Sequence, residues 1–201
     1  MLVVPRHKPE SEHGARKVQT VVNSLLSRGI QLAQTKLGNV QLVNLRTGSL
    51  DIRAQNGFDD EFLNYFQTVH LTQGSACARA MQSRGTIVVQ DVLADPMFRS
   101  ASTILRNAGV RAVQSVPLIS TSGAFVGVLS IHFLRPHRSA TSLLRHLEEM
   151  ARDAANAVIR TRAEGRSIDE MICASRTLVG ESKHVLAKAD RVLARYTLQS
   201  D

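Results

Sequence analysis

The side chains that could do chemistry in this sequence are few and widely spaced. Its two cysteines, Cys77 and Cys173, lie far apart and fit neither a CxxC motif nor a zinc-ligand spacing. Its seven histidines show no HExxH pair or other metal-ligand spacing. Asp91 and Asp95 could act as paired carboxylates, but no nucleophile and base can be paired beside them. We therefore predict a protein that is not an enzyme, with no metal site and no cofactor.

Each of these groups also has a structural interpretation. Cys77 could be a redox sensor or an attachment point, but its small, apolar flanks favour a buried structural thiol. Asp95 precedes a proline and suits a helix N-cap, while Asp91 suits a loop carboxylate that bonds nearby backbone amides. Ser130 and His132 alternate, which puts them on one strand face. His132 is then either a haem or metal ligand or a structural histidine, and the isolated His favours the structural role.

Long helices are predicted at both ends of the sequence. From about Glu12 to Lys36, apolar residues recur at alternating spacings of four and three, which predicts a helix stopped by Gly38. A longer helix is predicted from Ser139 to about Glu164, broken by Gly165. Shorter helices are expected at residues 59–69, 75–83 and 95–106.

Five apolar stretches between the long helices have strand character. They cover residues 39–46, 49–56, 85–89, 112–118 and 124–133. The first two join through Gly48 and the last two through residues 120–123, so each of these pairs predicts a β-hairpin. Strands bracketed by terminal helices predict an α+β fold with an antiparallel sheet.

The two long helices each carry a narrow apolar seam. Because such a seam is typical of helices that pair, we predict a homodimer formed through these helices, parallel or antiparallel. The residues assigned to the interface are Val18, Val22, Leu25, Leu143, Leu147, Met150 and Ala154.

Several motifs, in order along the chain, resemble those of GAF domains. The matching stretches are residues 54–58 (AQNGF), 74–80 (GSACARA), 89–98 (VQDVLADPMF), 109–118 (GVRAVQSVPL) and 123–133 (GAFVGVLSIHF), followed by Pro136-His137-Arg138. One departure is Ala78, where such sequences often have a second glycine. Together the motifs resemble the GAF domains attached to bacterial two-component sensors, over roughly residues 17 to 163.

The resemblance implies a sheet of about six strands, with long helices on one face and short helices that enclose a small-molecule pocket on the other. It implies a sensory, regulatory role, with an unidentified small-molecule ligand and a downstream signalling protein as partners. The residues assigned to ligand binding are Cys77, Asp91, Phe98, Arg111, Ser130 and His132. The Cys-His pair of bilin-binding GAF domains is missing from residues 100–107, and cyclic-nucleotide binding is not supported. A few GAF domains reduce free methionine sulfoxide with several pocket cysteines, whereas only Cys77 lies in this domain.

A net charge of +8 raises nucleic acid as an alternative partner. Basic residues are interleaved with acidic ones, as in Arg145, Glu148 and Arg152, which is typical of a solvated helix face and argues against nucleic-acid binding. Arg111 either steers an anionic ligand or forms a surface ion pair. The main interpretation is a sensor; the alternative is a transcriptional or nucleic-acid-associated regulator that uses the basic residues 167–198.

The sequence divides into three parts: a flexible arm at residues 1–12, a GAF domain at residues 13–164 and a C-terminal helical extension at residues 165–201. No apolar run approaches the roughly 20 residues that span a bilayer, and the opening apolar run is too short for a signal peptide. We therefore expect a cytoplasmic protein that makes no use of a membrane.

Overall fold

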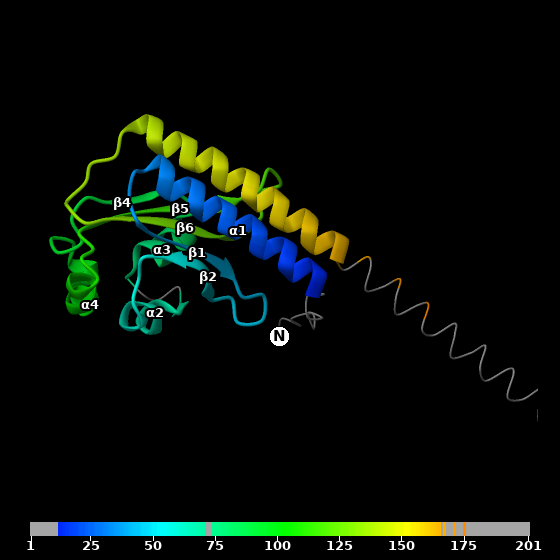
Figure 1. Cartoon of the computed structure of the whole chain (residues 1–201), viewed down its shortest axis with the longest axis horizontal. Helices are drawn as coiled ribbons and strands as arrows, with labels where there is room; N and C mark the ends of the chain where they lie inside the picture. Colours follow the sequence, from blue (N-terminus) through cyan, green and yellow to red (C-terminus); the bar gives the residue numbers. More distant parts are fainter. Residues whose placement is uncertain (1–11, 71–73, 166, 168–170, 172–174, 176–201) are drawn as a thin grey trace, which may run out of the picture.

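The computed structural model describes residues 12–70, 74–165, 167, 171 and 175. The chain forms one antiparallel sheet with helices on both faces (Figure 1). The strands are β1 (Leu37–Val43), β2 (Leu50–Asn56), β3 (Thr68–Val69), β4 (Ile87–Val89), β5 (Ala112–Ile119) and β6 (Phe125–Phe133). Their order is β3-β2-β1-β6-β5-β4, so the two predicted hairpins meet where β1 pairs with β6. The predicted α+β fold, with a sheet of about six strands, is confirmed.

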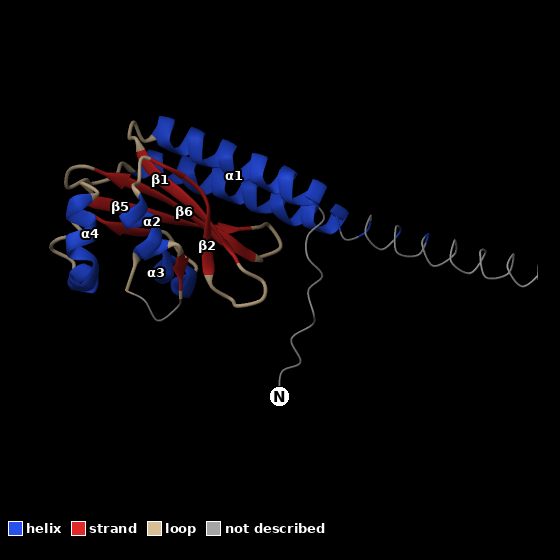
Figure 2. Cartoon of the chain, turned by 60° about the horizontal axis from the view of Figure 1, so that its bottom comes forward, coloured by secondary structure: helices blue, strands red, loops and turns tan. Residues whose placement is uncertain are grey.

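The helices separate into two layers. The long helices, α1 (Glu12–Leu32) and the helix of residues 141–165, lie side by side across one sheet face, called the helix face below (Figure 1). The short helices lie on the opposite face, called the pocket face (Figure 2). They are α2 (Asp60–Phe66), α3 (Ala76–Ser83), the 3-10 helix η1 (Pro96–Ala101) and α4 (Ser102–Asn107).

Local capping explains where the short helices begin. Asp59 Oδ1 accepts a hydrogen bond from Phe62 N at 2.9 Å, and Ser75 Oγ accepts one from Ala78 N at 3.3 Å. Asp95 Oδ1 accepts one from Met97 N at 2.9 Å, with Pro96 as the first residue of η1. The N-cap predicted at Asp95 is therefore present, and side-chain caps fix the starts of α2, α3 and η1.

Three predicted boundaries are wrong. The first helix ends at Leu32 and is followed by Gln34 at φ 51°, so a non-glycine residue takes the left-handed position and Gly38 lies inside β1. Gly165 is itself helical. The helix predicted at residues 59–69 ends at Phe66, because Thr68–Val69 pairs with β2 as the short strand β3, too short to show alternation. Residues 1–11 and most of 165–201 lie outside the described residues, so the arm and the extension stay predictions.

The helix-face core holds most of the residues assigned to a dimer interface. Val18, Val22 and Leu25 of α1 are at most 4% exposed, and Leu147 and Ala154 of the 141–165 helix are also buried. Leu143 and Met150 are partly buried against the same core. The apolar seams are therefore explained by packing of both helices on the sheet within one chain, so a second copy would have to contact other side chains.

At Gly127 of β6, the backbone of β1 leaves no room for a side chain. A Cβ atom added there would lie 3.0 Å from Leu42 Cα and would collide with the carbonyl oxygen of Gln41. Because this obstacle is backbone, it cannot move without separating the two strands.

We therefore expect Gly127→Ala to lower the free energy of unfolding by about 1–3 kcal/mol, the usual cost of overpacking. Urea denaturation followed by circular dichroism measures the change. Gly85→Ala is the matched control: the nearest atom to its added Cβ is 3.7 Å away, so its stability should stay within about 0.5 kcal/mol of wild type. Equal stability of the two variants would show that the strands can separate freely.

Candidate functional site

A row of polar side chains crosses the middle of the pocket face. Asn39 of β1 is the register partner of Ser130 of β6, and Ser130 is the partner of Ser115 of β5. The two serine hydroxyl oxygens lie 2.8 Å apart. Gln41 lies two residues along β1 and His132 two residues along β6, so both point to the same face. All five side chains are buried, none more than 7% exposed.

These side chains line a cavity of about 20 Å³, enough for one water molecule. The wall opposite the sheet comes from α2, α3, η1 and α4. The lining residues are Asn39, Gln41, Phe62, Phe66, Ser75, Ala76, Cys77, Phe98, Leu105, Val113, Ser115, Ser130 and His132. The polar groups thus gather on the sheet, while the opposing wall is largely apolar.

Several polar atoms of the row have no hydrogen-bond partner among the residues that the structure describes. They are Asn39 Oδ1, Gln41 Oε1 and both ring nitrogens of His132. The orientation of Gln41 is set by its Nε2, which donates to the Phe66 carbonyl at 3.3 Å. Each unpaired buried group costs about 1–3 kcal/mol. One water molecule donates only two hydrogens, so it cannot satisfy the row.

His132 is neutral in this setting. Its ring meets Phe58 edge-on, with ring centres 5.0 Å apart, and Phe62 at 5.8 Å. Burial without a charged partner lowers the pKa of His132 to about 3. It can therefore offer one N–H donor and one nitrogen acceptor to a guest.

Cys77 is a buried thiol at the start of α3, as its small flanking residues predict. Its Sγ lies 3.2 Å from Ser75 Oγ. Burial raises the pKa of the Cys77 thiol above its usual value, so the reactive thiolate is disfavoured. The thiol therefore contributes volume and weak polarity to the cavity wall.

Asp91 and Arg111 lie outside the cavity and pair with each other. Arg111 Nη2 donates to Asp91 Oδ2 at 2.8 Å, and Arg111 Nε donates to Asp91 Oδ1 at 3.3 Å. The hydrogen bond from Arg111 lowers the pKa of Asp91, and Leu93 N also donates to this carboxylate. Of the six residues assigned to ligand binding, the structure thus brings four to one cavity, Cys77, Phe98, Ser130 and His132, and leaves this ion pair apart.

Three residues of the polar row are absent from the sequence-based assignment: Asn39, Gln41 and Ser115. Asn39 and Gln41 alternate with the apolar Val40 and Leu42, a pattern that also fits a strand with one face in water. Only the pairing of β1 with β6 shows that this polar face is buried. Ser115 lies within the apolar stretch of residues 112–118, and a polar residue inside such a predicted strand is the available signal.

The described residues hold no cluster of three or more His, Cys, Asp or Glu side chains arranged for a metal ion. None of the helices in this part of the chain is both long and apolar enough to cross a membrane.

Comparison with known families identifies the chain's class. The family model described as "GAF domain" matches residues 15–158, well over half of the sequence. The chain therefore belongs to the GAF domain family, which confirms the resemblance seen in its motifs. Among curated proteins, no sequence matches it.

Solved structures of similar fold come from proteins with different roles. One is a domain of a putative two-component sensor histidine kinase from Sinorhizobium meliloti (TM-score 0.61, 20% identity, 73% of this chain and 93% of that chain). Another is the PixJ GAF domain of Thermosynechococcus elongatus in its blue-light-absorbing form (TM-score 0.63, 16% identity, 80% and 95%). A third is a type II free methionine-R-sulfoxide reductase from Thermoplasma acidophilum (TM-score 0.54, 15% identity, 75% and 96%). At these identities the likeness shows the fold alone.

The burial of His132 makes stability depend on pH. The folded-state pKa is about 3, against 6.5 for the free side chain, so between these values the unfolded chain binds one more proton. The unfolding free energy should therefore fall by about 1.4 kcal/mol for each pH unit lowered through this window.

We expect the unfolding free energy of His132→Gln to change less with pH than that of wild type, because the variant lacks the one proton that unfolding takes up at His132. Urea denaturation between about pH 6.5 and 4 measures the two slopes. His13→Gln, at an exposed position of α1, is the control and should keep the wild-type slope. Parallel slopes for all three proteins would mean that His132 is protonated in the folded state.

Proposed function

We propose that this chain is a non-catalytic sensory module of the GAF family that regulates signal transduction by binding a small molecule in the cavity of the pocket face. The observation that carries the proposal is the row of buried polar atoms without protein partners. A polar row of this kind costs folding free energy, and a guest that completes its hydrogen bonds would recover that energy as binding affinity.

Strand β6 provides a route from the cavity to the long helices. His132 faces the cavity, while its neighbours Ile131 and Phe133 belong to the helix-face core. A Cβ atom placed on Gly29 of α1 would lie 3.3 Å from Ile131 Cδ1, so α1 packs directly against β6. A shift of β6 on ligand binding would therefore reach α1 through adjacent residues of one strand.

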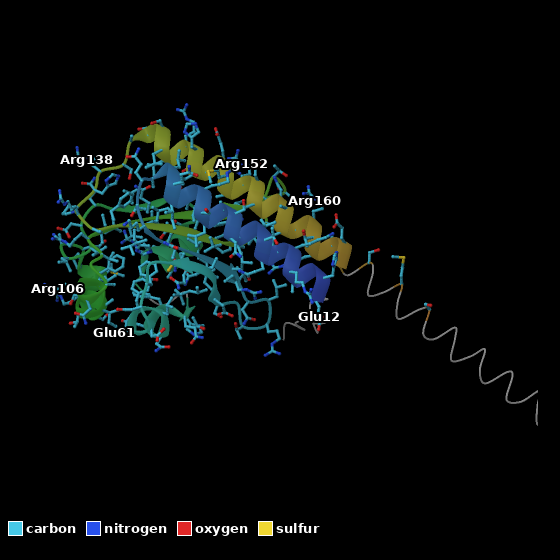
Figure 3. The ribbon with its side chains drawn as sticks, in the orientation of Figure 1. Glu12, Glu61, Arg106, Arg138, Arg152 and Arg160 are labelled. Carbon is cyan, nitrogen blue, oxygen red and sulfur yellow. The ribbon has the colours of Figure 1, made fainter. Side chains whose placement is uncertain are left out.

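The proposal includes a homodimer and a downstream signalling partner that contact the outer side of the long helices. Lys17 of α1 and Glu164 of the 141–165 helix form an ion pair of 3.8 Å that ties the two helices together. Figure 3 shows Arg152 and Arg160 along the 141–165 helix, where exposed charged residues of both signs alternate. Such a surface suits a polar, reversible contact better than a large apolar one.

Two alternatives remain less favoured. Reduction of methionine sulfoxide by thiol exchange needs a second thiol near Cys77, and the described residues include no other cysteine. A nucleic-acid-associated regulator would use residues 167–198, most of which lie outside the described residues. A steep salt dependence of DNA affinity would favour that alternative.

Occupancy of the cavity can be tested on protein purified under native conditions from its own host. We expect native mass spectrometry to show a small molecule retained by wild type, and Ser115→Leu to lose it because the larger side chain fills the cavity. Ser122→Leu, on the exposed turn between β5 and β6, is the control and should retain it. An empty protein that no metabolite stabilises in a thermal-shift screen would favour a partner-binding scaffold instead.

Coupling between the cavity and the long helices can be tested separately, by hydrogen exchange. When the retained molecule is added back to emptied wild-type protein, amide hydrogen exchange in residues 141–165 and in α1 should slow relative to the empty state. Slower exchange confined to the pocket face would contradict the coupling.

Dimer formation is tested by sedimentation equilibrium. The polypeptide mass is 22.0 kDa, and we expect a species of twice that mass at micromolar concentration. Reversing charge at Arg152 and Arg160 together should weaken the dimer while leaving the circular dichroism spectrum unchanged, because both side chains are exposed. A species of 22.0 kDa at every concentration would overturn this part of the proposal.

A further inference from the structure

We propose that the cavity selects uncharged, flat molecules that carry an amide-like edge, meaning adjacent hydrogen-bond donors and an acceptor on an apolar body. The inference rests on the proposed function and specifies the ligand class of the same site. It follows from three properties of the cavity: which polar atoms are free, the absence of charge among the lining residues, and the shape of the wall opposite the sheet.

The unpaired oxygen atoms on β1 are acceptors, so a guest must first supply hydrogen-bond donors. Asn39 Oδ1 and Gln41 Oε1 are both acceptors and are both unpaired, and they lie two residues apart on β1. Within the pair formed by Ser115 and Ser130, one hydroxyl donates to the other, which leaves the second hydroxyl hydrogen for a guest. A guest that presents N–H donors to the amide oxygens and one carbonyl to the hydroxyl would complete the hydrogen bonds of Asn39, Gln41 and the serine pair, and a primary amide has this combination.

Charge on the guest is disfavoured by its surroundings. Among the described residues that line the cavity there is no Asp, Glu, Lys or Arg, and His132 is held neutral. An ion placed here would be buried without a counter-charge, which costs far more than hydrogen bonds to neutral groups return. Arg111 with Asp91 and Arg79 with Asp95 form ion pairs, and none of these four residues lines the cavity.

The apolar wall indicates a flat body. Phe62 and Phe66 of α2 lie with ring centres 4.6 Å apart, and Phe98 and Leu105 complete the wall opposite the polar row. A thin aromatic or conjugated ring can lie between these side chains and the sheet with its polar edge turned to Asn39 and Gln41. Because the cavity holds only about 20 Å³, such a guest has to displace these side chains as it enters.

A matched set of four probes separates these properties. Benzamide is neutral and carries donors and an acceptor; acetophenone is neutral but lacks donors; benzoate is an anion and benzamidine a cation at neutral pH. We expect benzamide to bind at least about tenfold more tightly than each of the other three, measured by protein-observed NMR titration of the full chain. A tenfold ratio corresponds to about 1.4 kcal/mol, the net contribution of roughly one or two ordinary hydrogen bonds.

The chain offers a matched pair of variants. Gln41→Met removes the amide oxygen from the cavity with little change in volume, and we expect it to weaken benzamide binding about fivefold or more. Gln114→Met is the control, because Gln114 is equally buried, also has an unpaired amide oxygen, and lies on β5 among residues of the helix-face core. It should bind benzamide as wild type does.

Binding of benzoate, benzamidine or acetophenone as tight as that of benzamide would overturn the inference, as would equal weakening by the two variants. Absence of benzamide binding would overturn it too. The broader sensory proposal would survive that last result if native mass spectrometry found a charged or donor-free molecule in the cavity, so the two failures are distinguishable. The four-probe comparison on wild-type protein is decisive even if Gln41→Met does not fold.

Discussion

Strand β6 hydrogen-bonds to β1 on one side and to β5 on the other, and Gly127 lets its backbone approach β1 at a distance that no Cβ would permit. This pairing joins two hairpins that are distant in sequence. It places Asn39, Ser130 and Ser115 in one row, and it gives the long helices a continuous apolar surface on the other face. Both the cavity and the helix layer depend on it.

The pocket face combines good packing with poor hydrogen bonding. A buried polar network is most stable when every member is satisfied, and the row formed by Asn39, Gln41 and His132 is not. Replacing these side chains with apolar ones of similar size would be expected to raise stability. Retaining them is consistent with a domain whose fold is stabilised elsewhere and whose binding surface is not optimised for stability.

The sequence predicted those parts of the fold that depend on local patterns. The Asp95-Pro96 start of η1, both hairpins and both long helices follow from capping residues, turn residues and periodicity within a few positions. Alternation likewise placed Ser130 and His132 on one face. Long-range facts could not be obtained in this way: an apolar helix seam looks the same whether it meets a sheet or a second copy, which is why Val22 and Leu147 were assigned to a dimer.

The candidate site shows the same division. Asn39 and Gln41 have the spacing of a half-exposed strand, and only the neighbouring strand and α2 reveal that their face is buried. Asp91 and Arg111 lie 20 residues apart, so the sequence does not show that they pair. Both are assigned to ligand binding from the sequence, whereas in the structure they form an ion pair with each other. Sites formed by residues from several elements are therefore recognised from sequence only in part.

The small volume of the cavity has a kinetic consequence. A guest larger than water cannot enter until side chains on α2, α3 or α4 move, so opening precedes binding. The observed association rate should then rise with guest concentration only until it reaches the opening rate, and level off there. Dissociation would be limited by the same opening, so even a guest of modest affinity would leave slowly. A cavity this small would thus lengthen the lifetime of a bound guest without any added contact.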